Sequence, residues 1–172
     1  MKGHSAIHFV AALLLGSIVA AEETTTNGLD PSPKLLATLV SDLDRWLDDR
    51  CTYVHPDDEG PAIGFIDAGT EIMVGNELCK ITEDTRGFYD PERLKVFLVR
   101  PWDPADTFDV SVLLHELIHY RQEQYDWRCV AEMERPAYRL QEEWLTEQGV
   151  EYDFNWLVIY RLSRCPGANP HP

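Results

Sequence analysis

The spacing of apolar residues changes twice along the chain, and these changes restrict the fold more than any other feature. Residues 33–49 carry apolar side chains at helical spacing, which predicts an amphipathic helix. Short apolar runs bounded by Gly, Pro, Asp and Asn then predict strands at 62–66, 71–74 and 94–99. Residues 87–99 as a whole have the pattern of a hairpin. Helical spacing returns three times, at 109–124 (with Asp109 as its cap), 132–147 and 152–163. A helix, a sheet and then further helices predict an α+β fold.

The N-terminal segment differs in kind from the rest of the chain. Lys2 precedes an apolar run from Val10 to Ala20, and small residues follow, which predicts a signal peptide over residues 1–21. The run is short for a bilayer span, so a cleaved signal is favoured over a membrane anchor. The processed protein is then expected to be secreted or periplasmic and to have no membrane span.

The remainder of the chain is expected to form one domain. Residues 22–32 are polar and predict a flexible N-terminus, 33–165 a single domain and 166–172 a tail. The sequence has 30 Asp and Glu against 15 Lys and Arg, a net charge of −15. This charge repels phosphate backbones, so no nucleic-acid partner is expected. The sequence gives no indication of the oligomeric state.

An even number of cysteines in an exported protein predicts disulfides. After processing there are four: Cys51, Cys79, Cys129 and Cys165. The last two predicted helices are joined by only a few residues and should pack antiparallel, which brings Cys165 back toward Cys129. The pairing expected on this ground is Cys129–Cys165, with Cys51–Cys79 as the remaining pair.

Residues 114–120, Leu-His-Glu-Leu-Ile-His-Tyr, contain an HExxH motif. On a helix the positions i and i+4 share a face, so the imidazoles of His115 and His119 can reach one metal ion. Zinc suits neutral nitrogen ligands in a tetrahedral site. Glu116 lies about 100° round the helix, where its carboxylate can take a proton from zinc-bound water and pass it to a leaving amine.

A catalytic zinc site needs a third protein ligand. No histidine follows His119 at the spacing HxxGxxH, so the candidates are carboxylates: Asp126, Glu132 and Glu134. Glu134 is preferred because the small Ala137 would let its helix approach the HExxH helix closely. Glu132 stays an alternative because Pro136 confines Glu134 to the first helical turn or before it. Acidic residues at a helix N-terminus are also stabilised by the helix dipole without any metal.

The motif His115-Glu116-x-x-His119, followed by Glu134-x-x-Ala137-Tyr138-x-Leu140-Gln141, resembles the zincin metallopeptidases that have a glutamate third ligand (gluzincin-like). The resemblance covers roughly residues 86–148 and is strongest to small secreted bacterial members. It implies a minimal zincin-like domain with an N-terminal helix, a small mixed or antiparallel sheet, the HExxH helix and two packed C-terminal helices.

The resemblance also implies roles for individual residues. The zinc ligands would be His115, His119 and Glu134, with Glu116 as the general base, and an upstream edge strand, here Leu94–Val99, would align the substrate. Arg121 departs from the pattern, because many zincins have an apolar residue there.

A hydrogen-bond donor is also expected beside the zinc, to stabilise the tetrahedral intermediate. Tyr138, one turn beyond the third ligand, is the first candidate and Tyr120 the second, although buried tyrosines commonly serve packing alone.

Three functions follow from these patterns. The first is an exported zinc-dependent metallopeptidase that hydrolyses peptide or protein substrates. The alternative is a non-catalytic zincin-like module of the cell envelope that binds zinc or another protein. The third is an acidic interaction protein in which HExxH occurs by chance.

Overall fold

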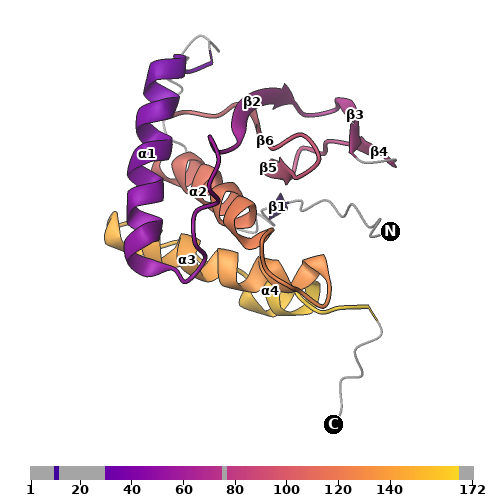
Figure 1. Cartoon of the computed structure of the whole chain (residues 1–172). Coiled ribbons are helices and arrows are strands. Elements are labelled where there is room, and N and C mark those ends of the chain that lie inside the picture. Colours follow the sequence, from indigo (N-terminus) through magenta and orange to yellow (C-terminus); the bar gives the residue numbers. More distant parts are fainter. Residues whose placement is uncertain (1–9, 12–29, 75–76, 167–172) are drawn as a thin grey trace.

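The computed structural model describes residues 10–11, 30–74 and 77–166 (Figure 1). The elements in chain order are β1 (Val10–Ala11), α1 (Pro33–Arg50), β2 (Ala62–Asp67), β3 (Glu71–Val74), β4 (Glu77–Lys80), β5 (Thr85–Asp90), β6 (Lys95–Arg100), α2 (Thr107–Gln122), the 3-10 helix η1 (Val130–Met133), α3 (Glu134–Glu147) and α4 (Trp156–Leu162). The fold is α+β, as the order of patterns predicts.

Most of the predicted signal peptide, residues 22–29 and the end of the tail lie outside the described residues. Within the described part, no helix is long and apolar enough to cross a membrane.

The sheet has the strand order β1-β5-β6-β2, and β3 and β4 form a separate hairpin. β5 and β6 pair antiparallel, with Gly87 opposite Leu98, so the predicted hairpin is confirmed. β6 also pairs with β2, in parallel. The expectation that Leu94–Val99 forms an edge strand is therefore wrong, because β6 is an inner strand with both edges paired. Its largely apolar sequence suits that position. β5 lies between β6 and the outer two-residue strand β1.

α2 is the central helix of the molecule. It packs against β5 and β6 of the sheet, α1 and α3, as Figure 1 shows. Every residue from Asp109 to Gln122 is buried as a result, including the polar ones.

α2 begins three residues earlier than the sequence suggests. Its cap is Asp106, whose carboxylate accepts hydrogen bonds from the backbone N–H groups of Phe108 (2.7 Å) and Asp109 (3.2 Å). The prediction of Asp109 as the cap is wrong, because its side chain accepts from Arg86 and from the backbone N–H of Asp103 instead.

Arg121, the departure from the zincin pattern, has a structural explanation. Its side chain is 1% exposed, and the guanidinium donates to Asp44 (2.9 Å) and Asp48 (2.8 Å) of α1. A third hydrogen bond reaches the backbone carbonyl of Tyr53 (3.3 Å). A charged residue here therefore fastens α1 to α2, and an apolar residue could not do so.

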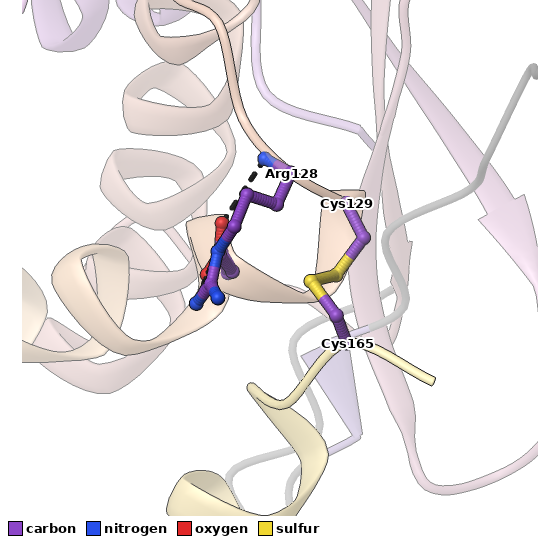
Figure 2. Close-up of a disulfide and its surroundings, with 4 residues drawn as sticks. Arg128, Cys129 and Cys165 are labelled. Atoms are coloured by element: carbon purple, nitrogen blue, oxygen red, sulfur yellow. Dashed lines mark hydrogen bonds and ion pairs between the residues drawn. A yellow bond between two sulfur atoms is a disulfide. The ribbon is translucent and has the colours of Figure 1, made fainter. Parts of the chain in front are cut away.

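The C-terminal helices are held by the predicted disulfide between Cys129 and Cys165, whose Cα atoms are 5.6 Å apart (Figure 2). The Cys51–Cys79 pairing is wrong, since the two residues are not joined. Cys51 follows α1 as its C-cap, whereas Cys79 is in β4, and α1 and β4 lie on opposite sides of the molecule (Figure 1).

Candidate metal centre

The structure brings His115, His119 and Glu134 together. Nε2 of His115 lies 3.5 Å from one Glu134 carboxylate oxygen, and Nε2 of His119 lies 3.6 Å from the other. One ligand atom from each of the three residues falls within 4.8 Å of the others. Both histidines are fully buried, and Glu134 is 13% exposed. This group of two imidazoles and one carboxylate has the composition of a catalytic zinc site.

Helix geometry places each of the three side chains. The histidines are one turn apart in α2, and Glu134 is the first residue of α3, the helix that packs against α2. Pro136 falls in the first turn of α3, where a missing backbone N–H costs no helical hydrogen bond. Ala137 is fully buried in the core that the two helices share.

The other two candidate carboxylates are elsewhere. Glu132 accepts hydrogen bonds from the Arg128 guanidinium and, at 3.1 Å, from the Arg128 backbone N–H. Those hydrogen bonds lower the pKa of Glu132. Asp126 is exposed in the loop between α2 and η1. The structure thus places Glu134 in the cluster and leaves Asp126 and Glu132 out of it.

Glu116 is fully buried beside β5. A Cβ built on Gly87 would come within 3.3 Å of a Glu116 carboxylate oxygen, so the strand passes very close to this group. Neither of its carboxylate oxygens has a hydrogen-bond partner that meets standard geometry among the described residues. Burial raises the pKa of Glu116 well above its usual range, and the negative charge of Glu134 adds to this, while the nearby backbone N–H of Tyr89 opposes it. A nearby divalent cation would favour the charged form again.

The two candidate tyrosines occupy different surroundings. Tyr138 packs edge-on against His115, with ring centroids 4.5 Å apart, and its pKa is raised first by burial and then by Glu134. It therefore remains a neutral donor next to the cluster. The Tyr120 hydroxyl donates to Asp58 instead, on the loop before β2.

Two glutamines contact the histidines, and the sequence patterns do not assign a role to either of them. Nδ1 of His115 is 2.9 Å from Oε1 of Gln141, and Nδ1 of His119 is 2.8 Å from Oε1 of Gln122. The available signal was spacing, because Gln122 is three residues after His119 on the same helix face. Gln141 lies seven residues after Glu134, two turns along α3, on the face that meets α2.

A family model described as a domain of unknown function (DUF6647) matches residues 32–172. The chain belongs to this family. No curated protein and no solved structure matches the chain significantly.

Proposed function

We propose that this DUF6647 protein is an exported zinc-dependent metallopeptidase, with zinc held by His115, His119 and Glu134. The observation that carries the proposal is the buried group of these three residues with the Glu116 carboxyl beside it. A structural zinc site fills all four positions with protein ligands, whereas three ligands leave one open. The resemblance to zincins, which rests on the HExxH motif and the later glutamate, implies the same three zinc ligands.

Bound zinc would polarise the scissile carbonyl and lower the pKa of a coordinated water. The protein's part is to move the proton. The Glu116 carboxylate accepts a proton from the attacking water and returns it to the leaving amine. Its burial beside β5 keeps the carboxylate from bulk water, which strengthens its interaction with the reacting groups. Tyr138, which packs edge-on against His115, would donate its hydroxyl hydrogen to the developing oxyanion.

A peptide substrate is supported by the position of β5. This strand passes Glu116 at Gly87, and it pairs on its outer side with the two residues of β1, antiparallel, with Val10 opposite Gly87. β1 lies within the proposed signal peptide, so removal of that peptide would open this edge of β5 to an extended substrate segment beside the general base. Addition of a strand to a sheet edge is a common mode of peptide recognition. We assign the alignment of substrate to β5, in place of β6.

Export is supported by two features. The Cys129–Cys165 disulfide is typical of oxidising compartments, and the apolar run from Val10 to Ala20 has the length of a signal sequence. The protein is thus proposed to act in the periplasm or outside the cell.

One observation favours the non-catalytic alternative, a zinc-binding module of the envelope. His115, Glu116 and His119 are each 0% exposed, and a substrate must reach such groups to react. In that function the same ligands would hold zinc without turnover.

The decisive experiment compares wild type, Glu116→Gln and Glu132→Gln for zinc content and for cleavage of a broad peptide library. Stoichiometric zinc in all three, with cleavage lost only in Glu116→Gln, is the expected result, because Glu132 binds Arg128 and serves as the matched control. Zinc without cleavage by wild type would favour the non-catalytic module. A wild-type protein without zinc even after reconstitution would refute both.

A further inference from the structure

The two imidazoles of the metal centre are each held through Nδ1 by a buried glutamine. We infer that Gln122 and Gln141 are positioning residues, an inference that rests on the proposed zinc site. They fix both histidines in the tautomer that carries hydrogen on Nδ1, so that both Nε2 lone pairs face the metal. From each ring, a short series of hydrogen bonds leads to a backbone carbonyl.

The first path begins at Gln122. Its Nε2 lies 3.1 Å from the backbone carbonyl oxygen of Met133. A carbonyl oxygen only accepts hydrogen bonds, so the NH₂ end of the amide must face Met133. The Oε1 end then faces His119, and because this oxygen also only accepts, Nδ1 of His119 must donate. The Met133 carbonyl therefore determines the tautomer of His119.

The second path is one residue longer. The Ser111 hydroxyl donates to the backbone carbonyl of Phe108 at 2.6 Å, which uses its single hydrogen. At 2.9 Å from Nε2 of Gln141, the same hydroxyl oxygen must then accept. The NH₂ end of Gln141 is thereby directed to Ser111 and Oε1 to His115, so Nδ1 of His115 must donate. The Phe108 carbonyl therefore determines the tautomer of His115.

These paths also orient the third ligand. Gln122 connects α2 to Met133, the residue directly before Glu134, and Gln141 connects α3 back to Ser111 of α2. The same hydrogen bonds thus hold the helix pair that brings the Glu134 carboxylate to both rings. Since Gln122 and Gln141 are neutral, they orient the rings without adding charge. Partners of this kind commonly change metal affinity by about 10- to 100-fold.

The tautomers can be measured directly in the metal-free wild-type chain. Long-range proton–nitrogen NMR distinguishes a protonated Nδ1 from a protonated Nε2 in each imidazole. The inference requires hydrogen on Nδ1 in both neutral rings, and hydrogen on Nε2 in either would overturn it. This measurement needs no variant and no bound metal.

The second test measures zinc affinity by competition with a chromophoric chelator. Gln141→Met and Gln122→Met remove the acceptor at similar volume and should each weaken zinc binding by about 10- to 100-fold. Gln141→Glu keeps an acceptor for Nδ1 of His115, and the Ser111 hydroxyl can rotate its hydrogen from the Phe108 carbonyl to the second carboxylate oxygen, so this variant should bind zinc more tightly than Gln141→Met. The matched control is Gln124→Met, which changes an exposed glutamine that donates to the Val54 carbonyl, and its zinc affinity should equal that of wild type.

The outcomes separate this inference from the proposed function. If wild type binds zinc and the methionine variants bind it equally well, the positioning role is wrong and the metal site stands. If wild type binds no zinc, the proposed function fails, while the tautomer measurement still decides the role of the two glutamines.

Discussion

Substitution of Gly87 by alanine tests the close approach of β5 to the metal helix. The new Cβ would lie 2.9 Å from Cγ1 of Val112 and 3.3 Å from both a Glu116 carboxylate oxygen and the Phe97 carbonyl. Carbon atoms pack best at about 3.5–4.0 Å, so β5 and α2 must separate by about 0.6–1 Å. Overpacking of this kind costs about 1–3 kcal/mol. The smaller entropy of the unfolded alanine chain returns up to about 1 kcal/mol. We expect Gly87→Ala to lower the free energy of unfolding by about 1–2 kcal/mol.

A double-mutant cycle with Val112→Ala isolates this contact. Val112 is fully buried, so its truncation alone should cost roughly 1–3 kcal/mol. In Gly87→Ala/Val112→Ala the new methyl occupies part of the vacated space. The double variant should therefore lose less stability than the sum of the two single losses, by about 1 kcal/mol or more. Urea unfolding of the four proteins measures the coupling.

Gly87→Ala should also affect activity, because the new Cβ displaces the Glu116 carboxylate. Displacement of the carboxylate by a fraction of an ångström should reduce kcat/KM for peptide cleavage by roughly 10- to 100-fold, with zinc content unchanged. Additive losses of stability within about 0.5 kcal/mol would refute the packing argument. Full activity in a Gly87→Ala protein would refute the placement of the general base against β5.

Two further predictions concern the attachment of α1. Asp44→Asn should lower the free energy of unfolding by about 2 kcal/mol, and Asp48→Asn by less than about 1 kcal/mol. The two carboxylates lie at similar distances from Arg121, but the Asp44 side chain is 19% exposed and the Asp48 side chain 61%. Equal losses in urea unfolding would contradict the role given to burial. Hydrogen bonds from Trp46 and Arg50 lower the pKa of Glu147, so its stabilising effect is complete above its ordinary pKa of 4.5 and is lost as the pH falls through the folded value. Stability measured between about pH 5 and pH 3 should fall less steeply in Glu147→Gln than in wild type.

The elements predicted best are those with long, regular patterns. The predicted helix at 33–49 matches α1 within one residue, and the predicted strands at 62–66, 71–74 and 94–99 lie close to β2, β3 and β6. The predicted helix at 152–163 is shorter in the structure, because α4 begins at Trp156, where Asn155 caps it. The sequence does not predict β4, because Glu-Leu-Cys-Lys lacks the apolar run that marks β3, Glu-Ile-Met-Val.

Local sequence also determined much of the candidate site. The i, i+4 spacing puts His115 and His119 on one face of any helix that they form. The position of Glu134 at the start of a helix with a small residue favours it as the third ligand. The sequence could not separate Glu134 from Glu132 by itself. The orientation of the N-terminus of α3 depends on how α3 packs against α2. The hydrogen bonds from Arg128 to Glu132 are a local contact that residue spacing does not reveal.

Local patterns are enough to predict most of the helices and strands, the pairing of Cys129 with Cys165 and the face of α2 that carries the two histidines. These follow from short-range periodicity and from antiparallel neighbours close in the chain. The folded structure alone reveals that β5 lies beside Glu116, that Cys51 and Cys79 stay apart, and that Gln122 and Gln141 hold the imidazoles. Those outcomes depend on contacts between residues distant in sequence, whose distances are set by how whole elements pack rather than by local spacing.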